Sequence, residues 1–104
     1  MATLPRAIAR SVELFLAAIG RQKHVEAAYL FGSQVRGTAT EWSDIDLAVV
    51  SPDFSSDRFQ ERVNLMRLAA QIDDRIEPSP FTPEDLKAND PLVSEILRTG
   101  VRVA

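Results

Sequence analysis

The chain has 104 residues, of which 45% are hydrophobic and 26% charged, with a formal net charge of -3 at pH 7. This length suits one domain, and the composition excludes disordered and collagen-like chains. The negative charge argues against binding nucleic acid through a broad basic face. Cysteine is absent, which excludes disulfides, thiolate–metal sites and cysteine nucleophiles. Without a long apolar run or a secretory signal, we expect a cytoplasmic domain spanning residues 1–104, with no membrane contact.

The first half of the chain predicts a helix and two strands. Apolar residues recur at helical spacing between Thr3 and Gly20. The unbroken apolar run Ala27–Phe31 is typical of a buried strand. A Gly-, Ser- and Thr-rich loop with one helical turn is expected over 32–43, followed by a second strand over 44–50.

A long helix is expected next, capped by Ser55 or Ser56 and running to about Gln71. Its apolar residues form two stripes, so one domain of this size is not expected to cover both, and the helix is a candidate interface with another protein or a second copy. The stripes are Phe59, Val63, Met66 and Ala70, and Leu65, Leu68 and Ile72.

The last third predicts one weak strand, two short helices and a terminal strand. Prolines in the segment 75–81 restrict this strand to a sheet edge, or else they lie at the end of the strand. Thr82 and Asp90 each precede a proline, which is typical of a helix start, and Gly100 ends the second helix before a strand over 101–103. The order of elements predicts an α/β or α+β fold, a small mixed sheet with helices packed on one side.

Two aspartates stand out in the second strand. Alternation places Asp44 and Asp46 on one face and the apolar residues between and after them on the other. Carboxylates this close raise each other's pKa, and a hard cation such as Mg²⁺ relieves the repulsion. A solvent-facing strand that happens to carry two aspartates is the alternative, so the pair alone does not define a site.

The turn before this strand has features of an anion site. Gly32 lets a phosphate approach the main chain, Ser33 adds a hydroxyl, Arg36 adds a positive charge and Gly37 permits a sharp exit. An ordinary turn with a surface arginine is the alternative.

The segment from Gly32 to Leu47, with Gly-Ser, a short basic turn and Ser-Asp-x-Asp-Leu, resembles the signature of the DNA polymerase beta-like nucleotidyltransferase superfamily. The length and the order of elements resemble its minimal nucleotidyltransferase family. The resemblance implies the polymerase-beta-like nucleotidyltransferase fold over the whole chain. Trp42 lies inside this segment and is expected either to stack on a nucleobase or to pack over the loop, and packing is the favoured expectation.

The resemblance also implies roles for individual residues. Gly32 and Ser33 match the pair that holds the nucleotide phosphates, and Arg36, Gly37 and Ser43 belong to the same nucleotide-binding segment. Asp44 and Asp46 match the metal-binding aspartates. A third carboxylate is required from the next strand, where Glu77 is the candidate. The family more often has Asp there, and Pro78 beside it is unusual. Asp73 and Asp74 are nearby substitutes, but they are better explained as a turn.

The implied reaction is transfer of a nucleoside monophosphate from a triphosphate, with ATP as the expected substrate, assisted by two Mg²⁺ ions. The resemblance implies a protein hydroxyl as acceptor and a HEPN-type toxin as partner, with this chain as the antitoxin. Two alternatives stay open. One is a degenerate binding module that neutralises a toxin by contact alone, and the other is transfer to a small molecule such as an aminoglycoside.

Overall fold

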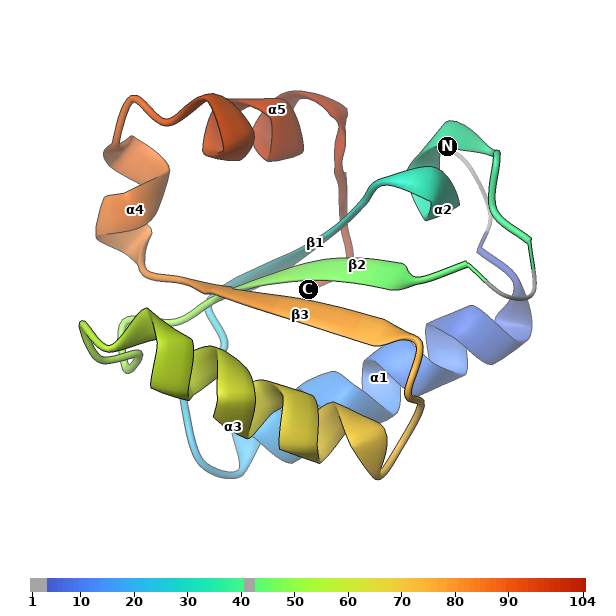
Figure 1. Cartoon of the computed structure of the whole chain (residues 1–104), viewed down its shortest axis with the longest axis horizontal. Helices are drawn as coiled ribbons and strands as arrows, with labels where there is room; N and C mark the ends of the chain where they lie inside the picture. The colour runs from blue at the N-terminus through green and yellow to red at the C-terminus, as the bar shows by residue number, and fades with distance from the viewer. Residues whose placement is uncertain (1–3, 41–42) are drawn as a thin grey trace.

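The computed structural model describes residues 4–40 and 43–104, which form one mixed sheet with helices on both faces (Figure 1). The described residues contain four strands in the order β3-β2-β1-β4. The elements in chain order are α1 (Arg6–Gly20), β1 (Ala27–Phe31), α2 (Ser33–Arg36), β2 (Ile45–Val50), α3 (Arg58–Ala70), β3 (Ile76–Phe81), α4 (Pro83–Lys87), α5 (Pro91–Thr99) and β4 (Val101–Arg102).

Strand pairing follows the connections between the strands. β1 is antiparallel to both β2 and β4, whereas β2 and β3 are parallel and are joined through α3. A parallel pair needs such a crossover, because the chain must return to the same end of the sheet. Of the two alternatives for the proline-containing strand, the structure shows the edge position, since β3 lies at the end of the sheet.

One face of the sheet carries the main core. Side chains of Leu30, Leu47 and Ile76 pack against α1 and α3, with Phe15 of α1 fully buried among them. The predicted alternation of β2 is confirmed, because Ile45, Leu47 and Val49 all join this core.

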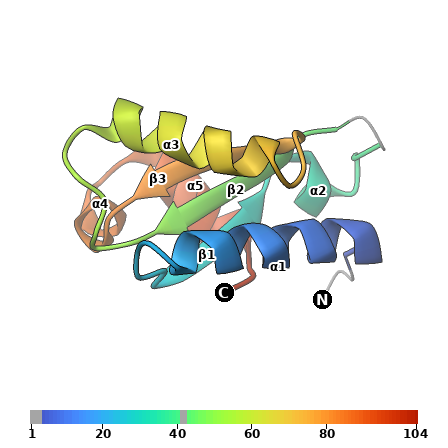
Figure 2. The same cartoon turned by 90° about the horizontal axis from the view of Figure 1, so that it is seen from below.

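The other face of the sheet is covered in part by α4 and α5, which lie behind the sheet in Figure 2, while α1 and α3 lie in front. Tyr29 and Val50 meet Val93 and Ile96 of α5 on this face. The expectation of helices on one side only is therefore wrong. The apolar residues of the short C-terminal helices need burial too, and the first face is already filled by α1 and α3.

The caps of the later helices explain where these elements begin. Asp57 caps α3 by accepting a hydrogen bond from the Gln60 N–H, so the expectation of Ser55 or Ser56 as the cap is wrong. Thr82 and Asp85 form a reciprocal capping box at α4, and Asp90 caps α5, as their sequence positions predict.

The two stripes predicted on α3 have different fates. Leu65 is buried and Leu68 packs against the core, whereas Phe59 is 78% exposed and Met66 is 42% exposed. The stripe that contains Phe59 and Met66 is therefore exposed in part, and its use as an interface stays a prediction. Within the described residues, each helix is too short or too polar to cross a membrane.

Candidate active site

The two aspartates lie at the start of β2 and on the face away from the main core. Asp46 is the second residue of the strand, and Asp44 directly precedes the strand in an exposed position. The pKa of Asp46 is raised by its partial burial and by the negative charge of Asp44, while the nearby Arg36 acts in the opposite direction. The pair is thus a concentration of negative charge that a cation would stabilise.

Gly32 supports the position of Asp46. It follows β1 directly, and the residue before it, Phe31, pairs across the sheet with Asp46. Its φ is 75°, a left-handed conformation that disfavours side chains, and a β-carbon at this position would overlap Asp46 Oδ2. Glycine is therefore required here both by the backbone conformation and by the closeness of the carboxylate.

The short helix α2 brings a positive charge to the same place. It runs from Ser33 to Arg36 and ends at Gly37, whose φ of 75° makes the left-handed exit that the sequence predicts. Arg36 is near enough to Asp46 to lower the pKa of that carboxyl against the effect of burial. A negatively charged ligand beside Asp46 would therefore meet a guanidinium as well as carboxylates.

These residues open into a pocket of about 380 Å³, which lies within the usual range for small-molecule sites. Gly32, Arg36 and Asp46 line it, together with the apolar side chains of Phe31 and Val35. Three of the predicted site residues thus share one concave surface. Ser33, Gly37, Ser43, Asp44 and Glu77 are not part of its lining.

The opposite wall of the pocket comes from α5, which the sequence analysis did not connect with the site. Leu92, Glu95, Ile96 and Thr99 line this wall. Their spacing places them on one face of a helix, which the sequence shows. That this face turns toward Asp46 depends on the packing of α5 across β1, for which no local sequence signal exists.

Glu77 lies on β3 beside Asp46, as the sequence predicts, but its carboxylate forms an ion pair with Arg62. It pairs in parallel register with Asp46, so both point to the same face of the sheet. Its Oε2 lies 3.6 Å from a guanidinium nitrogen of Arg62 on α3, and both side chains are partly exposed. Because β3 is the edge strand, the Glu77 side chain can reach around the sheet toward α3.

Ser43 and Asp73, two further residues considered in the sequence, form hydrogen bonds in turns. Ser43 accepts a hydrogen bond of 2.8 Å from the Thr40 N–H, which closes the loop before β2. Asp73 accepts hydrogen bonds from Ser11 and Arg75 in the turn after α3, as expected for a turn residue. Trp42 lies outside the described residues.

The chemistry of the carboxylates fits a hard cation held by two protein ligands, with other positions left to water and phosphate oxygens. Asp44 and Asp46 supply such ligands, and partial burial together with the charge of Asp44 raises the pKa of Asp46. Across residues 4–40 and 43–104, no three acidic or histidine side chains converge as a complete metal cage would require. Glu77 as a third ligand therefore stays a prediction.

A family model described as "Polymerase beta, Nucleotidyltransferase" matches residues 16–104. The chain belongs to this nucleotidyltransferase family. A curated relative from Methanocaldococcus jannaschii, named "Putative protein adenylyltransferase MJ1305", is 36% identical over 80 residues, which cover 71% of this chain and 54% of the relative. The chain thus spans about half the length of the curated relative it matches.

Two solved structures support the nucleotidyltransferase fold. A crystal structure of a "putative nucleotidyltransferase" from Sulfolobus solfataricus matches with a TM-score of 0.58 at 19% identity, covering 93% of this chain and 76% of that one. A crystal structure of a toxin–antitoxin with AMP-PNP matches with a TM-score of 0.62 at 23% identity, covering 90% of this chain and 70% of that one. At these identities the likeness shows the shared fold.

Proposed function

We propose that this nucleotidyltransferase domain transfers AMP from ATP to a hydroxyl group of a partner protein, with the help of Mg²⁺. The observation that carries the proposal is the placement of Asp46 in a pocket beside Arg36 and Gly32, with Asp44 two residues away. Membership of the family and the name of the M. jannaschii relative favour the same chemistry.

In this reaction the acceptor oxygen forms a bond to the α-phosphorus, the bond from that phosphorus to the bridging oxygen breaks, and pyrophosphate leaves. The hydroxyl proton passes to solvent. Mg²⁺, when bound, would neutralise charge on the entering and departing oxygens. Asp44 and Asp46 would hold it, while the Arg36 guanidinium would bind phosphate oxygens.

The other predicted residues would shape the phosphate site. The lack of a side chain at Gly32 makes room for the Asp46 carboxylate, and the left-handed Gly37 returns the chain from α2 toward β2. Ser33 would donate its hydroxyl to a phosphate oxygen. Ser43 would act by holding the loop before Asp44 through its bond with Thr40.

The acceptor is proposed to be a HEPN-type toxin, with this chain as the antitoxin. The toxin–antitoxin structure with AMP-PNP supports this proposal through its similar fold. The exposed stripe around Phe59 and Met66 on α3 offers an apolar surface for such a partner.

A degenerate module that neutralises its partner by contact alone is the second candidate. The ion pair between Glu77 and Arg62 favours it, because a carboxylate engaged on α3 does not complete a metal site with Asp46. This candidate predicts that neutralisation of the partner does not depend on Asp44 or Asp46.

The deciding experiment weighs the intact partner. The protein is tagged in its own host, the bound partner is purified, and its mass is compared between strains carrying the unmodified chain, Asp46→Asn, or the control Asp74→Asn. Asp74 is an exposed turn residue, so its substitution removes the same charge outside the site. We expect a partner heavier by one or more nucleotide units with the unmodified chain and with Asp74→Asn only. An unmodified partner bound equally in all three strains would support the contact-only module.

A further inference from the structure

The wall of the pocket formed by α5 carries a carboxylate of its own, Glu95, across from Arg36 and Asp46. Asp90 caps this helix, and Val93 and Ile96 anchor it on the sheet, so the backbone at Glu95 is held in place by the fold. Arg36 on α2 places a positive charge beside Asp46, whereas α5 adds the carboxylate of Glu95 to the lining.

The ion pair between Glu95 and Arg98 is weak enough to be exchanged. The Oε2 atom of Glu95 lies 3.1 Å from a guanidinium nitrogen of Arg98, in a pair whose side chains are 71% and 61% exposed. Surface pairs of this kind contribute at most about 1 kcal/mol. A ligand in the pocket can therefore replace Arg98 as the partner of this carboxylate.

The surroundings of Glu95 suit a flat, largely apolar ring with a hydrogen-bond donor at its edge. Leu92, one turn before Glu95, is 54% exposed, and Phe31 and Val35 line the pocket across from it. A triphosphate would be repelled by Glu95 and attracted by Arg36, so the phosphates belong at the α2 wall. The nucleobase then belongs at the α5 wall.

From this arrangement we propose that Glu95 determines the choice of nucleobase by accepting a hydrogen bond from an exocyclic amino group, and that Leu92 packs against the ring. This inference rests on the proposed nucleotidyl transfer. A base with a carbonyl oxygen in place of the amino group would place this oxygen against the carboxylate. Both groups are hydrogen-bond acceptors, so the contact is unfavourable. Glu95 is a specificity residue in this scheme and takes no part in breaking the phosphate bond.

The test compares binding of two non-hydrolysable triphosphates, AMP-PNP and its inosine counterpart, to the full chain with excess Mg²⁺ by titration calorimetry. Hypoxanthine carries a carbonyl where adenine carries the amino group. We expect the unmodified chain to bind AMP-PNP about tenfold more tightly than the inosine analogue, and Glu95→Ala to remove this preference by weakening AMP-PNP alone. Glu95→Gln, which keeps a carbonyl acceptor, should retain part of the preference.

The matched control is Glu13→Ala on α1. Glu13 is an exposed helical carboxylate with an arginine three residues away, as Glu95 is, but it lies outside the pocket. Equal weakening of both nucleotides by Glu95→Ala would overturn the inference in favour of a role toward the cation or the phosphates. An unchanged preference in Glu95→Ala would overturn it as well.

Failure of the proposed function would look different. If the unmodified chain, shown to be folded by a cooperative thermal transition, binds neither analogue, the nucleotidyl transfer and the inference both fail. If it binds AMP-PNP, and Asp46→Asn loses the Mg²⁺-dependent part of that binding while Glu95→Ala keeps the base preference, only the inference fails.

Discussion

Gly32 and Asp46 are in such close contact that any side chain at position 32 would overlap the carboxylate oxygen Oδ2 of Asp46. Gly32 directly follows β1 and Asp46 lies on β2, and the antiparallel pairing of Phe31 with Asp46 sets the distance between them. The geometry of the carboxylate therefore depends on the absence of one β-carbon just beyond the end of the neighbouring strand.

Gly32→Ala is expected to destabilise the protein by about 2–4 kcal/mol, because it adds both a left-handed backbone conformation and an overlap with Asp46. The measurement is urea unfolding followed by circular dichroism. Gly20→Ala is the control, since it has open space around it at the end of α1 and should be neutral or stabilising by up to about 1 kcal/mol. Equal stability of Gly32→Ala and the unmodified chain would contradict the closeness of this contact.

Removal of Mg²⁺ should lower the stability of the unmodified chain and leave the stability of Asp46→Asn unchanged. Burial and Asp44 raise the pKa of Asp46, so the charged form of this carboxylate is less favourable in the folded chain than in water. Asp46→Asn should then be at least as stable as the unmodified chain without Mg²⁺.

Added Mg²⁺ should raise the unfolding temperature of the unmodified chain, by an amount equivalent to about 2.7 kcal/mol when its concentration is 100 times the dissociation constant. Thermal unfolding with and without a chelator measures this effect, with Asp74→Asn as the charge control. An identical rise in Asp46→Asn would show that the ion binds elsewhere.

Substitutions of Glu77 and Arg62 test whether Glu77 is the third metal ligand. If Glu77 completes the metal site, Glu77→Gln should abolish transfer, whereas Arg62→Ala should preserve or increase it by releasing the carboxylate from the 3.6 Å ion pair. Transfer of labelled AMP to the partner measures both, and Arg67→Ala controls for loss of a positive charge on α3. Full transfer by Glu77→Gln would remove Glu77 from the site.

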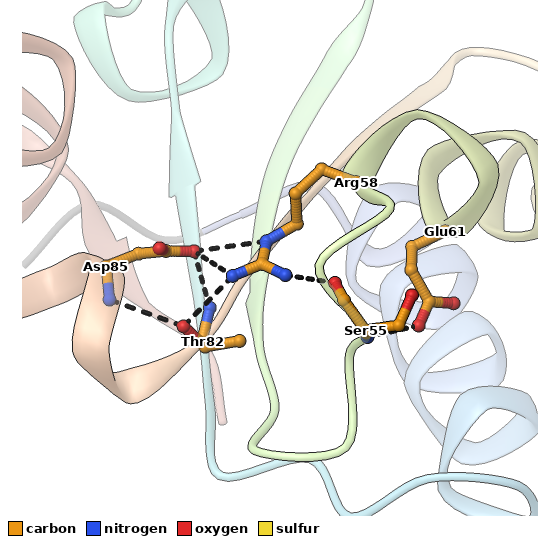
Figure 3. A network of polar contacts seen from close by, with 5 residues as sticks. All are labelled: Ser55, Arg58, Glu61, Thr82 and Asp85. Atoms are coloured by element: carbon orange, nitrogen blue, oxygen red, sulfur yellow. Dashed lines mark hydrogen bonds and ion pairs between the residues drawn. The ribbon is translucent and has the colours of Figure 1, made fainter.

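Arg58 is expected to stabilise the joint between α3 and α4. Figure 3 shows its guanidinium between the carbonyl of Ser55 and the carboxylate of Asp85, and its nitrogens lie 2.9 Å from Asp85 Oδ2 and 3.1 Å from Thr82 Oγ1. Arg58→Ala should cost about 1–3 kcal/mol in the free energy of unfolding, because it leaves the nearly buried Thr82 and its capping partner without this donor.

The exposed Arg10, whose ion pair with Glu13 spans 4.0 Å, is the matched control for Arg58. Arg10→Ala should change the free energy of unfolding by less than about 0.5 kcal/mol. Chemical denaturation of the two variants side by side checks the difference, and equal losses would show that the network around Asp85 adds no stability.

Asp73 should make the protein sensitive to acid. Hydrogen bonds from the Arg75 side chain are the main cause of a pKa well below the usual range, and they outweigh the opposing effect of burial. Since the folded-state pKa lies below the unfolded value of about 3.9, this stabilisation is present above that pH and is lost as the pH falls below about 4.

Asp73→Asn should therefore lower the free energy of unfolding by about 2–3 kcal/mol at pH 7. The difference in this free energy between the variant and the unmodified chain should shrink as the pH falls below about 4. Urea unfolding at several pH values measures the difference, and Asp74→Asn controls for the loss of one neighbouring charge. A difference that stays constant down to pH 2 would contradict the role of the Asp73 carboxylate.

Local patterns in the sequence determined much of this protein. The alternation in β2 places Asp46 and Leu47 on opposite faces of the sheet, and the glycines at 32 and 37 set the turn around α2. The prolines restrict β3 to a sheet edge or else lie at a strand end, and the structure shows the edge. These features depend on neighbours along the chain, so residue type and spacing are sufficient to predict them. The resemblance to nucleotidyltransferases rests on the same short segment.

Only the tertiary structure decided which distant residues meet. It placed α4 and α5 on the second face of the sheet, brought Glu95 across the pocket from Asp46, and paired Glu77 with Arg62. Each of these contacts joins residues on different elements, and the placement of α4 and α5 depends on which apolar faces are already covered. The sequence shows that α5 has an apolar face, but the filling of the first side of the sheet by α1 and α3 determines where that face packs.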